Sequence, residues 1–260
     1  GQSMNVQAEK LRKKPQVVVA TPGRLLDLVE RKLIDISNIY TLVLDEADEM
    51  LKMGFIRDIK RIIAITPEDK QIALFSATMP REVLNITWSF MQGAKEIDVM
   101  PKAEDRPKID EYMLEVAQKD KTLAIIRLMK ENGFSKSIVF CNTKLAATEV
   151  YEVLKSSGFK CGCLQGDMGQ GARNRMMDSF HHGKFDLLVA TDVVARGIDV
   201  DDVDAVFNYD IPKDNEFYLH RIGRTARAGK TGKAYSLVSY LDRPRMEEII
   251  RYTGANPTTI

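Results

Sequence analysis

The sequence lacks the features that would place it in a membrane or outside the cell. Its 260 residues include only three cysteines, too few for a disulfide framework. No apolar run approaches the ~18 residues that a membrane-spanning helix needs. No charged and then apolar leader opens the chain either. We therefore expect a cytoplasmic protein with no membrane partner.

The chain also lacks a strong net charge and a metal-binding cysteine pattern. Its formal charge is +1, so any nucleic-acid surface has to be a local patch. Cys161 and Cys163 stand at strand spacing, with His181 and His182 further along. A zinc site is one interpretation, but no C-x-x-C pair anchors it. We expect these cysteines to be core residues instead.

Apolar β-branched runs alternate with segments of helical periodicity, which predicts an α/β protein with parallel sheets and crossover helices. The first part of the chain offers three strands, at Gln16–Thr21, Thr41–Ala47 and Gln71–Thr78. The second part offers five, at Ser137–Cys141, Lys160–Gln165, Asp186–Thr191, Ala205–Asp210 and Lys233–Ser239. The length is sufficient for two such domains.

A charged stretch with two prolines, Pro101–Lys108, interrupts this alternation and predicts a linker. We predict a first domain over residues 1–99, a linker over residues 100–108 and a second domain over residues 109–260. Sheets usually contain about five or six strands. The three strands of the first part therefore predict an incomplete domain.

An acidic turn, Val43–Asp48 with the sequence VLDEAD, ends one of the predicted buried strands. Carboxylates at the carboxyl edge of a parallel sheet are costly unless a cation binds there. In the Walker-B arrangement Asp45 would hold Mg²⁺ through water, and Glu46 would accept a proton from an attacking water. Asp48 is too far along for the first role and would contact another loop. A solvated acidic turn is the alternative.

Arginines recur at every third residue in the segment His220–Gly229. Residues i and i+3 share a face of a helix, so Arg224 and Arg227 are predicted to project together. Two guanidinium groups on one face favour an anion such as phosphate between them. Arginine fingers in phosphoryl transfer need this arrangement. A solvated basic face is the alternative.

Eight segments stand in the order found in one known family: TPGR (Thr21–Arg24), DEAD (Asp45–Asp48), SAT (Ser76–Thr78), VFCNT (Val139–Thr143), QGAR (Gln170–Arg173), ATD (Ala190–Asp192), ARGID (Ala195–Asp199) and HRIGRTARAG (His220–Gly229). Through them the whole chain resembles the DEAD-box ATP-dependent RNA helicases of superfamily two. The resemblance implies two RecA-like domains, ATP and Mg²⁺ as cofactors, RNA as the partner and a monomeric state.

The resemblance also implies roles for individual residues. Catalysis falls to Asp45, Glu46, Arg224 and Arg227, with Asp45 as the Mg²⁺ ligand through water. Coupling between the loops falls to Asp48, Ser76, Thr78, His220 and Arg221. Nucleotide binding falls to Gly197 near the phosphates and Asp199 at the ribose. RNA binding falls to Thr21, Gly23, Arg24, Asn142, Thr143, Gln170, Arg173, Thr191 and Asp192. Hydroxyls, backbone N–H groups and a few arginines can hold an RNA backbone without reading bases. Without the resemblance, Pro22–Gly23 reads equally well as a turn and Asn142–Thr143 as a helix cap.

The sequence departs from the family mainly by an absence. It contains no G-x-x-x-x-G-K-[ST] loop, whose backbone N–H groups cradle phosphates, and the segment Ala228–Lys233 lacks the glycine spacing to replace it. The family's glutamine and P-T-R-E-L segments are missing too, so we expect an N-terminally truncated helicase. Gln165 stands where a histidine is frequent, and Ala226 stands where the family commonly has glycine; its extra methyl group should be tolerated in a helix.

Two alternatives follow for the function. The isolated chain would be a catalytically incompetent fragment that acts as a weak RNA- or protein-binding module. A DNA helicase or nuclease of the same superfamily is the other alternative, which the spelling of the acidic and arginine motifs disfavours.

Overall fold

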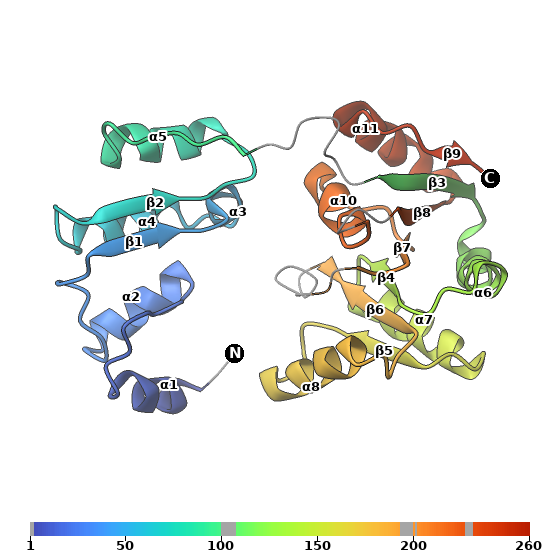
Figure 1. Cartoon of the computed structure of the whole chain (residues 1–260), viewed down its shortest axis with the longest axis horizontal. Helices are drawn as coiled ribbons and strands as arrows, with labels where there is room; N and C mark the ends of the chain where they lie inside the picture. Colours follow the sequence, from blue (N-terminus) through green and yellow to red (C-terminus); the bar gives the residue numbers. More distant parts are fainter. Residues whose placement is uncertain (1–2, 100–107, 193–199, 201, 227–230) are drawn as a thin grey trace. The chain divides into compact units, whose positions relative to one another are not determined.

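The computed structural model describes residues 3–99, 108–192, 200, 202–226 and 231–260. The chain divides into two compact units, Gly1–Met100 and Pro101–Ile260, each with its own parallel sheet (Figure 1). Nearly all of the predicted linker lies outside the described residues. Within the described part of the chain, no helix is both long and apolar enough to cross a membrane.

The second unit is built on a seven-stranded sheet with the strand order β5-β6-β4-β7-β8-β3-β9. All of its strand pairs are parallel. The strands are β3 (Ile109–Glu115), β4 (Ser137–Cys141), β5 (Cys161–Leu164), β6 (Leu187–Thr191), β7 (Ala205–Asn208), β8 (Gly232–Val238) and β9 (Thr258–Thr259). The α-helices described are α6 (Lys121–Asn132), α7 (Lys144–Ser156), α8 (Gln170–His181), α10 (Asn215–Ile222) and α11 (Arg243–Thr253). Short 3₁₀ turns, η2 (Gln118–Asp120) and η3 (Tyr240–Asp242), precede α6 and α11.

Helices cover both faces of this sheet, which explains why its central strands are continuous apolar runs. Every residue of β4 is buried. Val139 and Cys141 join the core cluster that includes α6 and α7, whereas Ile138 and Phe140 join the cluster that includes Phe180 of α8. All five strands predicted for this unit are present, with ends that differ by at most two residues. β3 was not predicted as a strand, since its acidic residues interrupt the apolar pattern.

The first unit has a two-stranded parallel sheet, β1 (Thr41–Leu44) with β2 (Gln71–Leu74), in which Thr41 lies opposite Gln71. Its helices are α1 (Met4–Leu11), α2 (Pro22–Glu30), α3 (Ala47–Lys52), α4 (Ile56–Ala64) and α5 (Arg81–Phe90). Ile59 and Ile63 of α4, one turn apart, pack with Leu44 and Ile86 in the core of this unit.

The prediction of a strand over Gln16–Thr21 is wrong. No described residue of this segment belongs to a strand, and the side chains of Val17 and Val19 are 79% and 94% exposed. A strand forms only where a neighbouring strand takes its backbone hydrogen bonds, and none lies beside this segment among the described residues. Three consecutive valines carry β propensity, but they do not supply that partner.

The cysteines are core residues, as expected. Cys141 and Cys161 are buried in the larger core cluster, and Cys163 packs against it. Burial raises the pKa of each thiol, to about 12 for Cys161. Thiolates therefore do not form here at neutral pH.

Candidate functional site

The predicted acidic turn lies where β1 ends and α3 begins. Asp45 and Glu46 are both exposed, and Glu46 adopts left-handed backbone angles, φ 50° and ψ 50°. This conformation costs about 1–2 kcal/mol for a residue with a Cβ atom. The Asp45 carboxylate accepts the Glu46 N–H at 3.0 Å, which stabilises the tight turn. Both carboxylates are thereby presented at the carboxyl edge of the sheet.

Asp48 anchors this turn to the loop that follows β2. Asp48 is only 3% exposed. One oxygen of its carboxylate accepts the Thr78 N–H at 3.0 Å and the Thr78 hydroxyl at 2.7 Å. The Asp48 N–H donates to Ser76 Oγ at 3.2 Å. Burial opposes ionisation of Asp48, but the bonds from Thr78 and Ser76 outweigh it and lower the pKa of the carboxyl group. The expected contact between the SAT residues and Asp48 is present.

The TPGR residues form the start of α2. Thr21 precedes the helix, and Gly23 is exposed in its first turn. The Arg24 guanidinium donates to Gln7 Oε1 at 3.1 Å, which ties α2 to α1. Whether these residues bind RNA stays a prediction.

Arg221 is the centre of a buried network at the carboxyl edge of the larger sheet. Arg221 is 2% exposed, and all five N–H donors of its side chain have acceptors. Nε and Nη2 donate to the two carboxylate oxygens of Asp192 at 2.6 and 2.7 Å, and Nη2 also donates to Asn142 Oδ1 at 2.9 Å. Nη1 donates to Asn208 Oδ1 at 3.2 Å and to the Asp210 carbonyl at 2.7 Å. The guanidinium therefore has no donor left for a phosphate.

Two residues predicted to bind RNA belong to this network. Asp192 holds Arg221 with both carboxylate oxygens, and Asn142 contacts it through Oδ1. The Asn142 backbone N–H donates to Asp210 Oδ2 at 2.8 Å, and its Nδ2 donates to the Ile211 carbonyl at 2.9 Å. These side chains position Arg221, and an RNA contact by either stays a prediction.

The remaining RNA-site predictions lie on separate elements. Thr143 caps α7 through Oγ1, which accepts the Ala146 N–H at 3.1 Å, so the helix-cap interpretation holds for this residue. Gln170 is exposed at the start of α8, and Arg173 follows on the same helix, partly buried. Thr191 is buried at the end of β6.

The helical arrangement predicted for the arginine segment is wrong at its second half. α10 ends at Ile222, and beyond it Thr225 forms an isolated parallel bridge with Val203. Arg224 therefore lies beyond the helix, with its Nε donating to the His220 carbonyl at 3.1 Å. Ala226 is also outside a helix and has a φ of 62°. The expectation that its methyl group is accommodated in a helix is therefore wrong.

Three predicted residues, Arg227, Gly197 and Asp199, lie outside the described residues. Across the described residues, no group of three or more His, Cys, Asp or Glu side chains gathers as a metal site. A Mg²⁺ ion at Asp45 would take most of its ligands from water and phosphate oxygens, which is usual for this ion. The exposed Asp45 fits that mode of binding.

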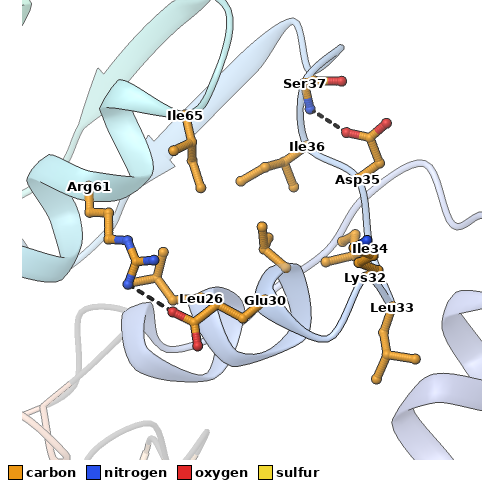
Figure 2. A pocket seen from close by; sticks show the side chains of 11 residues that line it. Leu26, Glu30, Lys32, Leu33, Ile34, Asp35, Ile36, Ser37, Arg61 and Ile65 are labelled. Atoms are coloured by element: carbon orange, nitrogen blue, oxygen red, sulfur yellow. Dashed lines mark hydrogen bonds and ion pairs between the residues drawn. The ribbon is translucent and has the colours of Figure 1, made fainter.

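A hollow of about 430 Å³ lies elsewhere in the first unit, among α2, the segment 32–37 and α4. Figure 2 shows Ile36 and Ile65 pointing into it, beside the ion pair between Arg61 and Glu30 at 2.8 Å. The segment 32–37 leads into the amino end of β1, and the acidic turn leaves its carboxyl end. The hollow is therefore not the predicted nucleotide site.

Sequence reasoning missed Asn208 and Asp210, which hold Arg221 and Asn142. A signal was present, because both stand at the carboxyl end of a predicted strand, as Asp45 and Asp192 do. Polar residues at these ends converge at one edge of a parallel sheet.

Comparison with known proteins agrees with the motif order. The family model described as DEAD/DEAH box helicase matches residues 1–86, and the helicase conserved C-terminal domain model matches residues 120–229. A crystal structure of a DEAD box protein from Methanococcus jannaschii is 40% identical, with a TM-score of 0.57 over 100% of this chain and 70% of that one. The chain belongs to the DEAD-box helicase family.

Several DEAD-box relatives are longer than this chain. The ATP-dependent RNA helicase DeaD of Buchnera aphidicola subsp. Baizongia pistaciae is 47% identical over 251 residues, which are 96% of this chain and 42% of the relative. DeaD of Escherichia coli strain K12 is 45% identical over 96% of this chain and 40% of the relative. The chain thus spans about 40% of the length of these curated relatives.

A solved DEAD-box structure contains ligands of the expected kinds. Dbp5 of S. cerevisiae bound to RNA and ADP BeF3 has a TM-score of 0.80 and 34% identity, over 94% of this chain and 65% of that one. The parallel sheets flanked by helices described above are RecA-like domains of this family.

Proposed function

We propose that the chain is a working part of an ATP-dependent RNA helicase, which couples ATP binding and hydrolysis to local RNA duplex unwinding or RNP remodelling. Residues 1–99 and 109–260 are its two RecA-like domains and residues 100–108 their linker. The protein acts as a cytoplasmic monomer with largely sequence-independent RNA contacts. The names of the DeaD relatives and the ligands of Dbp5 support this proposal.

One observation carries the proposal: buried Asp48 fixes the acidic turn through its hydrogen bonds to Thr78 and Ser76. Asp48 is buried and hydrogen-bonded to Thr78 and Ser76, whereas Asp45 and Glu46 are exposed at the carboxyl edge of the sheet. A merely solvated acidic turn would need neither the buried anchor nor the left-handed Glu46. Preorganised groups of this kind are typical of catalytic sites.

The proposed roles follow from chemistry and position. Asp45 would hold Mg²⁺, and the ion would supply positive charge next to the nucleotide phosphates. Glu46 orients the attacking water and accepts its proton. Arg224 and Arg227 stabilise charge on the transferred phosphoryl group. Asp48, Ser76 and Thr78 couple the acidic turn to the loop that follows β2. His220 and Arg221 have a coupling role among the loops of the second domain.

Gly197 and Asp199 contact the nucleotide in this proposal. The RNA backbone is held by the TPGR residues and by Asn142, Thr143, Gln170, Arg173, Thr191 and Asp192. The phosphate-binding loop is not among the 260 residues. An activity test must therefore supply it.

The test is RNA-stimulated ATP hydrolysis by the 260-residue chain and by a chimera of E. coli DeaD whose matched region is replaced by this chain. We expect RNA-dependent turnover by the chimera and its loss in a Glu46→Gln chimera. Glu30→Gln, at the rim of the hollow, is the matched control and should retain activity. A folded chimera without turnover would refute the proposal for these residues. Turnover by the chain alone would instead reveal an unrecognised phosphate-binding element.

A further inference from the structure

Lys121, the first residue of α6, is a fully buried charged side chain outside the residues discussed so far. Its exposed fraction is 0%. Nζ donates to Asp242 Oδ2 at 2.8 Å and to the Tyr209 carbonyl at 2.9 Å, and it lies 5.6 Å from the centre of the Tyr209 ring. Lysine is almost never fully buried without partners, because its desolvation is costly.

Asp242, the acidic partner, is itself fixed in place. Its Oδ2 accepts the Ser239 N–H at 3.0 Å and the Ser239 hydroxyl at 2.6 Å. Burial opposes ionisation of Asp242, but the bonds from Lys121 and Ser239 outweigh it, so the pKa of this carboxyl group is lowered. Asp242 therefore stays ionised at neutral pH, and its ion pair with Lys121 joins η3 to α6.

The other contact of Lys121 leads to the Arg221 network. The Tyr209 carbonyl belongs to the peptide group that continues into Asp210, whose N–H donates to the Phe140 carbonyl at 3.3 Å. The next carbonyl, that of Asp210, accepts Arg221 Nη1 at 2.7 Å, and Asp210 Oδ2 accepts the Asn142 N–H. Lys121 thus holds the carbonyl of Tyr209, the residue before Asp210. Asp210 accepts the bonds from Arg221 and from the Asn142 N–H.

Stability alone does not account for an ion pair at this place. Lys121 is 0% exposed and the Asp242 side chain 28% exposed. Ion pairs with a charge taken out of water contribute little net stability, so the presence of this pair points to a geometric role. The geometry points to Lys121 as a positioning residue, which fixes the Tyr209–Asp210 peptide and, through it, the guanidinium of Arg221. Its effect on ATP hydrolysis rests on the proposed function, whereas its effect on Arg221 does not.

The first experiment is nuclear magnetic resonance of the ¹⁵N-labelled 260-residue chain. Lys121→Met removes the charge and the donors with little change in volume. Lys130→Met is the matched control, since Lys130 is on the same helix and exposed. We expect Lys121→Met to shift or broaden the Arg221 Nε–H and Asn142 amide signals, and Lys130→Met to leave both unchanged. Unchanged signals in folded Lys121→Met would overturn the inference.

A second variant covers failure of Lys121→Met to fold. Asp242→Asn removes the charge of the partner and keeps Lys121, and the same two signals are expected to move. If Asp242→Asn folds and leaves both in place, the inference is likewise overturned.

The activity arm uses the DeaD chimera. Lys121→Met is expected to lower kcat about tenfold, the loss that is typical when a supporting residue is removed. Lys130→Met should keep the original kcat. An unchanged kcat in the Lys121→Met chimera would contradict the inference. A chimera without any turnover would instead refute the proposed function, and the two resonance signals would still decide the role of Lys121.

Discussion

Replacing Arg221 by lysine is the sharpest test of the buried network. Lysine keeps the positive charge but has three donors in place of the five that Arg221 uses. At least two of the five acceptors then lose their partner, in a network where Arg221 is 2% exposed and Asn208 fully buried. An unsatisfied buried polar group costs about 1–3 kcal/mol. Two such losses predict a decrease of about 4 kcal/mol in the free energy of unfolding of the second unit.

Amide hydrogen exchange can measure this decrease in each unit separately. Exchange in β4, β6 and β7 reports opening of the second unit, and exchange in β1 and β2 reports the first unit. We expect protection to fall by about 4 kcal/mol in the former and to stay unchanged in the latter.

The matched control for this experiment is Arg127→Lys. The Arg127 side chain is 78% exposed and forms a surface pair with Glu131. Such a pair contributes roughly 0.3–0.5 kcal/mol, so protection should hardly change. A decrease below about 1 kcal/mol for Arg221→Lys, the size of one ordinary hydrogen bond, would refute the view that the five bonds hold this edge together.

Three further predictions concern other contacts. Thr78→Val removes the hydroxyl bond to Asp48 and should lower stability by about 1–2 kcal/mol at neutral pH; because the folded-state pKa of Asp48 is lowered, this difference should disappear as urea titrations are taken below about pH 4. Gly232→Ala should unfold the second unit in circular dichroism melts, since a Cβ atom would lie 2.3 Å from Thr225 Oγ1 and 2.5 Å from its Cγ2. Cys161 should resist iodoacetamide at pH 8 by mass spectrometry until the chain is unfolded, because burial raises its thiol pKa to about 12.

Two of these predictions have a matched control variant in the chain. Thr148→Val removes a hydroxyl that donates only to the Lys144 carbonyl of its own exposed helix turn, and it should be nearly neutral at every pH. Gly171→Ala places a Cβ atom 3.5 Å from an Arg175 nitrogen in the first turn of α8, which is ordinary contact, and should leave the melting temperature unchanged or higher. A pH-independent loss for Thr78→Val, an unchanged melting temperature for Gly232→Ala or rapid labelling of native Cys161 would contradict the respective argument.

The sequence predicted the strands of the second unit because each is buried on both faces, and continuous apolar runs arise where helices cover a sheet from both sides. The run at Gln16–Thr21 has the same composition and is not a strand. Composition records the propensity of a segment, but strand formation depends on hydrogen bonds to a neighbour elsewhere in the chain. For that reason one pattern gave right and wrong predictions in the same sequence.

The candidate site was predictable where a single element defines it. A strand that ends in an acid located Asp45 and Glu46 without further information. The burial of Asp48 depends on Thr78, 30 residues away, and only the family resemblance pointed to that contact. The orientation of Arg221 was not predictable, because an arginine turned into the protein and one turned outward have the same spacing in the sequence.

The arginine segment therefore divides into two kinds of residue. Arg221 lies within α10, is buried and has used every donor, whereas Arg224 lies past the helix end and is only half-buried. An anion that approaches this segment cannot be contacted by Arg221 without breaking the network. Loss of activity on replacing Arg221 would then report a displaced scaffold and come with lower stability. Arg224 is half-buried, and its loss should lower stability less than the loss of Arg221 does, so measuring activity and stability for both variants separates positioning from contact.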